Sequence, residues 1–124
     1  MTKKILVIED EQYLRELYAE ILEEAGFSAT QASNGKEGYL ALCRNTYDLI
    51  LLDVMLPQMD GLEILKRLAE KKLLEKIKDK IVLLTNLSQD MIFTKSLSLG
   101  VKNFWIKSDL TPEQFLTKVK QLLK

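Results

Sequence analysis

Three short apolar runs limit the fold of this chain more than any other feature: residues 5–8, 49–52 and 81–84. Each run is continuous rather than alternating and is built from isoleucine, leucine and valine, a pattern typical of strands that are buried on both faces. Such strands belong to parallel sheets, because parallel neighbours need a crossover connection, which usually lays a helix on the sheet. The runs therefore predict a parallel sheet with helices between its strands.

The segments between these runs carry the spacing of amphipathic helices. The first expected helix presents one apolar face, which comprises Leu14, Leu17, Tyr18, Ile21, Leu22 and Ala25. Gly26 follows this face and is expected to end the helix. A second helix is expected over Gly35–Arg44, after the capping residues Ser33 and Asn34, and a third begins near Gly61.

The last helix has the clearest beginning in the chain. Thr111, Pro112 and Gln114 supply an N-cap, a first-turn proline and the partner of a capping box. The buried stripe expected for this helix comprises Phe115, Leu116, Val119, Leu122 and Leu123.

Weaker signals complete a regular alternation of strands and helices. They predict strands at residues 29–32 and 103–106 and a helix at about 90–99. The order is then strand–helix five times over, and crossovers between parallel strands are right-handed. We expect a three-layer α/β/α sandwich, a (βα)5 flavodoxin-like fold with strand order 2-1-3-4-5, formed by residues 1–124 as a single domain.

Composition excludes several classes of function. Eighteen basic and eighteen acidic residues leave no net charge to draw the chain onto nucleic acid or a membrane surface, and the lysine-rich residues 71–80 are expected to form a solvated face. The chain has no histidine and one cysteine, Cys43, so neither a Cys/His zinc site nor an internal disulfide is expected. We interpret Cys43 as a small buried residue. No signal segment or membrane span is evident, which predicts a cytoplasmic protein.

Polar side chains gather where the expected strands end. Ligands of open parallel sheets bind at the carboxyl ends of the strands. The residues at those ends are Glu9, Asp10 and Glu11, then Asp53, then Thr85 and Asn86, and lastly Lys107. Converging carboxylates repel one another unless a cation joins them, and oxygen ligands favour Mg²⁺ over Zn²⁺. An acidic cap at a helix N-terminus is the simpler alternative for the first three residues.

A lysine and a hydroxyl beside such a metal site suit the negative charge of a transferring phosphoryl group. Asp53 ends the most apolar run and is the best candidate for a carboxylate nucleophile that forms an acyl phosphate. The sequence therefore predicts phosphoryl transfer at this edge of the sheet.

Four segments resemble the signature blocks of the CheY-like receiver domains of response regulators. They are KILVIEDE at residues 4–11, DLILLDVMLPQMDG at residues 48–61, KIVLLT at residues 80–85 and NFWIKSD at residues 103–109. The resemblance covers essentially the whole chain. It implies a phosphoacceptor domain of a two-component system that catalyses its own phosphorylation and dephosphorylation and has no turnover substrate.

The resemblance also implies a role for each site residue. Asp53 resembles the phosphorylated aspartate, and Lys107 is expected to pair with the phosphoryl oxygens. The expected Mg²⁺ ligands are Asp10, Asp53, the backbone carbonyl of Met55 and, through water, Glu9.

The same resemblance implies partners and a switch. A sensor histidine kinase or a phosphotransfer protein would donate the group from a phosphohistidine. Phosphorylation would draw Thr85 inward and let Phe104 pack, which alters a surface formed by residues 90–99, strand 103–106 and the last helix. The expected output is a separate effector or a fused domain, and the expected assembly state is a monomer or weak dimer.

Some positions differ from the family pattern. Ser108 stands where a proline after a cis bond is usual, which leaves the geometry of Lys107 open, and Asn86 replaces a small residue. Trp105 is expected either in the core or at an interface. Met55 and Leu87 are apolar where polar side chains can orient water, so we expect slow hydrolysis of the acyl phosphate.

Three other functions remain as alternatives. A degenerate receiver would bind proteins without being phosphorylated, which Ser108 and Asn86 favour. A Mg²⁺-dependent phosphohydrolase would need a second aspartate after the nucleophile, whereas Val54 and Met55 follow Asp53. A nucleotide-binding module would need a glycine-rich loop after the first strand, and none is present.

Overall fold

The sheet has the composition and order that the apolar runs predict. The computed structural model describes residues 2–86 and 90–124, with the side chains of residues 90–93 left out. The five strands run parallel in the order β2-β1-β3-β4-β5. They are β1 (Lys4–Ile8), β2 (Ser28–Ala32), β3 (Leu49–Asp53), β4 (Ile81–Thr85) and β5 (Asn103–Ile106).

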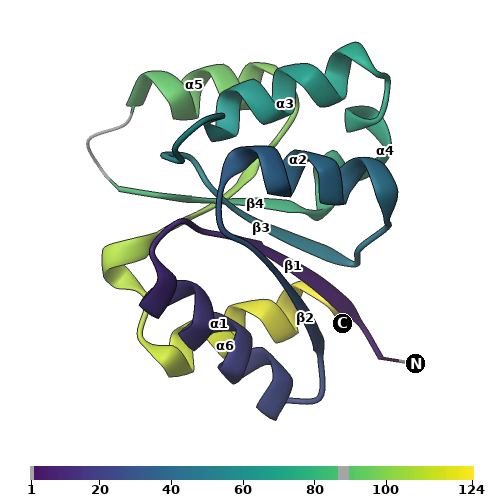
Figure 1. The fold of residues 1–124 in the computed structure, drawn as a ribbon. Coiled ribbons are helices and arrows are strands. Elements are labelled where there is room, and N and C mark those ends of the chain that lie inside the picture. Colours follow the sequence, from purple (N-terminus) through teal and green to yellow (C-terminus); the bar gives the residue numbers. More distant parts are fainter. Residues whose placement is uncertain (1, 87–89) are drawn as a thin grey trace.

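Helices cover both faces of this sheet (Figure 1). The helices are α1 (Gln12–Glu24), α2 (Gly35–Arg44), α3 (Gly61–Glu70), α4 (Leu74–Ile77), α5 (Asp90–Ser98) and α6 (Pro112–Leu122), with 3-10 turns η1 (Lys78–Lys80) and η2 (Lys107–Asp109). Figure 1 shows α1 and α6 on one face and α2, α3, α4 and α5 on the other. The predicted three-layer α/β/α sandwich of flavodoxin-like topology is therefore confirmed.

Capping residues fix where several helices begin. The side chains of Asn34, Asp60 and Thr111 accept hydrogen bonds from backbone N–H groups in the first turns of α2, α3 and α6. At α6 both halves of the predicted capping box form. Gly26, at φ 94°, follows the end of α1 as expected.

Each sheet face has its own apolar core, because successive strand residues point to opposite sides. The α1/α6 face packs Tyr18 and Trp105 against Phe115, whose ring centroid lies 4.4 Å from that of Tyr18 and 6.2 Å from that of Trp105. Trp105 is therefore a core residue rather than an interface residue. The opposite core gathers alternate strand residues such as Ile8 and Leu52 under α2 and α3.

Some predicted burial is wrong. Cys43 is exposed, because it lies on the outer side of α2 rather than over the sheet. Leu122, in the predicted stripe of α6, is 43% exposed, and Tyr13 at the start of α1 is 72% exposed. The lysine-rich segment also contains a short helix, α4, which the sequence did not predict and which buries Leu74.

No described helix is long and apolar enough to cross a membrane. The cytoplasmic location expected from the sequence stays a prediction.

Candidate functional site

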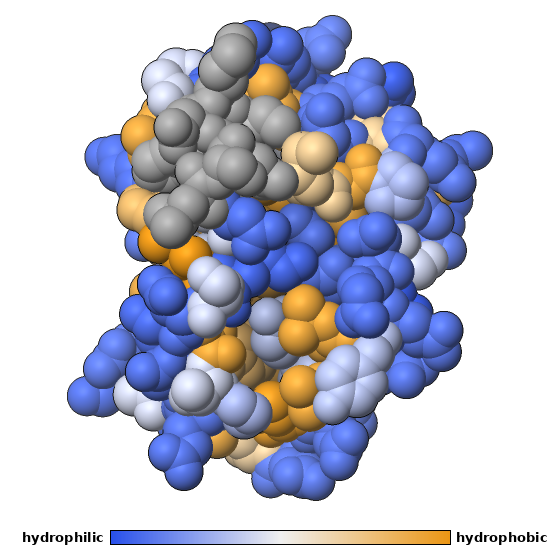
Figure 2. All heavy atoms as spheres, turned by 90° about the vertical axis from the view of Figure 1, so that its left-hand side faces the viewer, coloured by the Kyte–Doolittle hydropathy of each residue, from blue (hydrophilic) through white to orange (hydrophobic). Residues whose placement is uncertain are grey.

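The carboxyl ends of β1, β3, β4 and β5 bring the predicted polar residues to one edge of the sheet. Figure 2 looks onto this edge, the left-hand side of Figure 1, and shows a hydrophilic band across the middle of the molecule. Glu9 and Asp10 directly follow β1, Asp53 ends β3, Thr85 ends β4 and Lys107 follows β5. Parallel pairing of β1 with β3 and of β3 with β4 is what places these ends side by side.

One ammonium group lies between two buried carboxylates at this edge. Lys107 Nζ lies 2.6 Å from Glu9 Oε1 and 3.0 Å from Asp53 Oδ2. Glu9 has no exposed surface, Asp53 is 5% exposed, and the Lys107 side chain is 17% exposed. Ion pairs this far from water are weakly screened, so they fix the geometry of the site more firmly than a surface pair would.

Burial and the neighbouring charges shift the ionisation of this group of side chains. Burial raises the pKa of Glu9, an effect that the hydrogen bond from Lys107 opposes and the charge of Asp53 reinforces. Burial alone would lower the pKa of Lys107, but its hydrogen bond to Glu9 and the charge of Asp53 outweigh that effect and raise it. The lysine is therefore held as a cation.

The acidic residues fit a hard divalent cation. Glu9, Asp10 and Asp53 each offer a carboxylate oxygen within 4.8 Å of the others. Opposite ligands of an octahedral Mg²⁺ with bonds of about 2.1 Å stand about 4.2 Å apart, so the spacing allows one of the three to act through water. Three carboxylates face one ammonium, which leaves net negative charge for a cation to neutralise.

Arg15 holds the backbone that carries the acidic pair, a role that the sequence did not predict. Its Nη1 donates to the carbonyl of Glu9 at 3.0 Å and approaches the carbonyl of Asp10 at 3.5 Å. Its Nε donates to Gln31 Oε1 on β2 at 3.2 Å. An arginine on α1 thus ties the end of β1 to the neighbouring strand.

Of the three adjacent acids Glu9, Asp10 and Glu11, Glu11 alone serves as the helix cap that was the simpler interpretation of this run. The Glu11 side chain caps α1 by accepting a hydrogen bond from the backbone N–H of Leu14. Glu9 turns inward to Lys107 instead, and Asp10 belongs to the metal-competent group. The three adjacent acids therefore divide between a helix cap and the site.

The segment after Asp53 is shaped by its own backbone. The Met55 N–H donates to Asp53 Oδ1 at 3.1 Å, while the Met55 side chain is 51% exposed. A Cβ on Gly61 would lie 3.0 Å from the Cα of Val54 and 3.2 Å from the carbonyl oxygen of Asp53, so a glycine lets α3 begin this close to the strand without a backbone shift. Leu87, expected to influence phosphate lifetime, lies outside the described residues.

The residues of the expected switch lie on neighbouring strands. The Thr85 hydroxyl donates to the carbonyl of Asn86 at 3.0 Å, and Phe104, one strand over, is 42% exposed. Among the described residues no peptide bond is cis, so the Lys107–Ser108 bond is trans. With a trans bond Lys107 still reaches Asp53, which answers the question raised by Ser108.

Comparison with known proteins agrees with this geometry. The model of the response regulator receiver domain family matches residues 5–120. The transcriptional regulatory protein SrrA of Staphylococcus aureus is 33% identical over the whole chain, which spans 49% of the length of SrrA. The chain thus spans about half the length of the curated relatives that it matches.

Solved structures share the fold. A receiver domain of a signal transduction histidine kinase from Syntrophus aciditrophicus is 31% identical, with a TM-score of 0.81 over 98% of this chain and 90% of that one. The chemotaxis response regulator CheY4 of Vibrio cholerae, at 22% identity, has a TM-score of 0.84 over 99% of this chain and 100% of that one, which supports the fold alone. By family match, fold and the gathering of acids and lysine at one sheet edge, the chain belongs to the response regulator receiver domains of two-component systems.

Proposed function

We propose that Asp53 accepts a phosphoryl group, in a Mg²⁺-dependent reaction, from the phosphohistidine of a sensor histidine kinase or of a phosphotransfer protein. The observation that carries this proposal is the convergence of Glu9, Asp10 and Asp53 within 4.8 Å, with Lys107 Nζ 3.0 Å from Asp53. These are the groups that phosphoryl transfer requires: a nucleophile, a metal site and a cation.

Four groups of the chain would hold the metal. Asp10, Asp53 and the backbone carbonyl of Met55 would bind Mg²⁺ directly, and Glu9 would act through water. The metal supplies positive charge to the phosphoryl oxygens and draws the like-charged carboxylates together.

The transfer itself needs no further group from this chain to carry a proton. An Asp53 carboxylate oxygen attacks the phosphorus, an O–P bond forms, and the P–N bond to the donor histidine breaks. The ring nitrogen of the donor histidine keeps the electron pair of the P–N bond. A proton on the other nitrogen of that ring makes the leaving group a neutral imidazole. Lys107, held as a cation, stabilises the charge that spreads over the phosphoryl oxygens.

We further propose that phosphorylation reorients Thr85 and Phe104. The Thr85 hydroxyl, which donates to Asn86, would turn to the new phosphate, and the half-exposed Phe104 ring would move inward. The surface of α5, β5 and α6 would then change its affinity for a partner, either a separate effector or a fused domain. The relative SrrA is named a transcriptional regulatory protein and is about twice as long as this chain. The domain would modify itself and turn over no other substrate.

Intact-mass spectrometry after incubation with Mg²⁺ and acetyl phosphate tests the proposal. Wild type should gain one phosphoryl group, and Asp53→Asn should gain none. Asp60→Asn is the matched control, because Asp60 is a helix cap in the same segment and asparagine caps as well as aspartate. Chelation of Mg²⁺ should abolish the gain in wild type.

The degenerate receiver is the second candidate, favoured by Asn86 beside the site. It predicts no mass gain in wild type and no binding of beryllofluoride, the phosphoryl mimic. Modification of both Asp53→Asn and wild type would place the acceptor elsewhere and contradict the assignment.

If the acyl phosphate forms, its lifetime tests the role of Met55. The apolar Met55 side chain cannot orient an attacking water, so Met55→Asn should lose the phosphate faster than wild type. Equal rates of loss would refute this role.

A further inference from the structure

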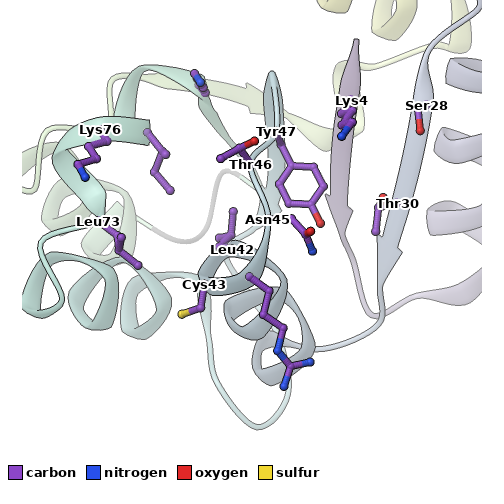
Figure 3. A pocket seen from close by; sticks show the side chains of 13 residues that line it. Lys4, Ser28, Thr30, Leu42, Cys43, Asn45, Thr46, Tyr47, Leu73 and Lys76 are labelled. Carbon is purple, nitrogen blue, oxygen red and sulfur yellow. The ribbon is translucent and has the colours of Figure 1, made fainter. Parts of the chain in front are cut away.

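A basic hollow lies at the opposite edge of the sheet, where the strands begin. It has a volume of about 750 Å³, within the range of small-molecule sites. Its lining comes from the starts of β1 and β2, the end of α2, the loop at residues 45–47 and the α4–η1 segment. Figure 3 shows Tyr47 standing in the middle of the hollow, with Lys4 to one side and Lys76 to the other.

The charge of the lining is one-sided. Lys4, Arg44, Lys76 and Lys80 line the hollow, and no carboxylate does. None of these four side chains takes part in an ion pair within the described residues. In a chain with equal numbers of acids and bases, four unneutralised cations around one hollow repel each other and favour an anionic ligand.

The nearby carboxylates are already engaged. Asp48 accepts a hydrogen bond from the backbone N–H of Lys4 at 2.8 Å. Glu75 pairs with Lys78 at 2.9 Å, and neither acid lines the hollow. Within the described residues the chain's own acids therefore form no ion pair with the four cations.

A buried hydroxyl in the hollow gives a second, independent indication. Tyr47 is only 7% exposed, and no hydrogen bond within the described part of the chain engages its hydroxyl. Figure 3 shows this hydroxyl directed toward Asn45, whose side chain likewise lacks a hydrogen bond among the described residues. Buried polar groups are almost always hydrogen-bonded, so a ligand with an acceptor oxygen accounts for the Tyr47 hydroxyl, and the exposed Asn45 amide is close enough in Figure 3 to donate to the same ligand.

We propose that this hollow binds a small anion that carries two linked phosphate groups. The Tyr47 hydroxyl and the Asn45 amide donate to phosphate oxygens in the middle of the hollow. The cations on its two sides, with Lys4 on one and Lys76 on the other, each neutralise one phosphate. The apolar side chains of Leu42, Leu73 and Ile77 in the lining offer a contact surface for an organic group on the ligand.

Inorganic pyrophosphate is the probe. It is titrated without Mg²⁺, so that no metal at Asp10 and Asp53 can bind it at the carboxyl ends of the strands. Backbone amide NMR should show saturable shifts at residues 28–30 and 45–47, and these should weaken as ionic strength rises. Orthophosphate should bind at least several-fold more weakly, because it reaches the cations of one side only. ADP binding more tightly than pyrophosphate would identify an organic diphosphate as the ligand class.

Two matched pairs of variants separate this site from general attraction to surface lysines. Tyr47→Phe removes only the hydroxyl and should weaken pyrophosphate binding about fivefold, whereas Tyr39→Phe, a buried tyrosine outside the hollow, should not. Lys76→Gln with Lys80→Gln should abolish saturation, whereas Lys118→Gln with Lys120→Gln on α6 removes equal charge and should leave it unchanged. Absence of saturable shifts in wild type, or equal effects within either pair, would overturn the proposal.

Discussion

The two edges of the sheet carry opposite charges in opposite surroundings. At the carboxyl edge, Glu9 and Asp53 are buried and share the ammonium of Lys107. At the amino edge, the cations around the basic hollow are exposed and form no ion pair among the described residues. The carboxyl edge is therefore fixed by its own ion pairs, whereas the amino edge has cations, unpaired in the described part of the chain, that can bind an anionic ligand.

This difference follows from how parallel strands are connected. Each crossover leaves the carboxyl end of a strand and packs its helix back onto the sheet, so the loops at that end meet over the centre of the sheet. Buried charges there survive only in compensated groups. At the amino edge the cations of the basic hollow are themselves exposed, and long lysine side chains remain hydrated there at little cost.

The largest expected effect tests how tightly each edge is packed. A Cβ on Gly35, at the carboxyl edge, would lie 1.6 Å from the carbonyl oxygen of Met59, so the backbone must move. Gly35→Ala should lower the free energy of unfolding by about 3 kcal/mol, more than alanine gains in helix propensity. Chemical denaturation measures this loss.

Gly26→Ala is the matched variant at the amino edge. Its Cβ would meet no atom within 4 Å, and only the positive φ of 94° opposes it. The expected loss is about 1 kcal/mol. A loss at Gly26 as large as that at Gly35 would show that the two edges are equally constrained.

The next effect concerns the cation at the carboxyl edge. Lys107→Ala should slow phosphorylation of Asp53 by about 100-fold, because the transferring group loses a preorganised positive charge. Lys102→Ala removes an exposed lysine at the other end of the same strand and should leave the rate unchanged. Initial rates with acetyl phosphate give the comparison, and equal rates for the two variants would exclude Lys107 from the reaction.

Much of the fold was predictable because its strongest signals are local. The strands β3 and β4 are apolar up to their last residues, Asp53 and Thr85, and the Thr111 capping box marks the start of α6 within four residues. The β2 sequence SATQA gave a weaker signal, because an edge strand has one neighbour and a mostly exposed surface. The α4 helix was missed, since the lysines around Leu74 obscure its short apolar face.

The site was predictable to the extent that its residues end strands. Glu9, Asp10, Asp53 and Lys107 follow directly from that rule once the strands are recognised. Arg15 was not predictable in this way, because its contact depends on a long side chain that reaches back from α1 to the end of β1. The division of Glu9 and Glu11 between site and helix cap likewise required coordinates.

Arg15 offers a smaller test of how the acidic edge is held. Arg15→Gln removes the hydrogen bonds to the carbonyls of Glu9 and Asp10, so the pair should be less well placed and Mg²⁺ affinity should fall about fivefold. Arg67→Gln is the control, because its exposed pair with Glu63, at 3.8 Å, lies outside the site. Calorimetric titration with Mg²⁺ distinguishes them, and unchanged affinity in Arg15→Gln would confine Arg15 to packing.

The smallest effect lies at the margin of the carboxyl edge, where Glu37 accepts hydrogen bonds from the N–H and the hydroxyl of Ser33 at 2.7 and 2.8 Å. These bonds lower the pKa of Glu37 below its ordinary value of 4.5. A lowered pKa in the folded state stabilises the protein above the ordinary value, and this stability is lost as pH falls through the folded-state pKa. Because Glu37 is exposed, Glu37→Gln should cost no more than about 0.5 kcal/mol at neutral pH, and the difference from wild type should vanish in acid. Urea unfolding across this pH range measures it, with Glu20→Gln on the outer side of α1 as the control. A difference that persists in acid would mean that Glu37 acts through packing rather than through its charged hydrogen bonds to Ser33.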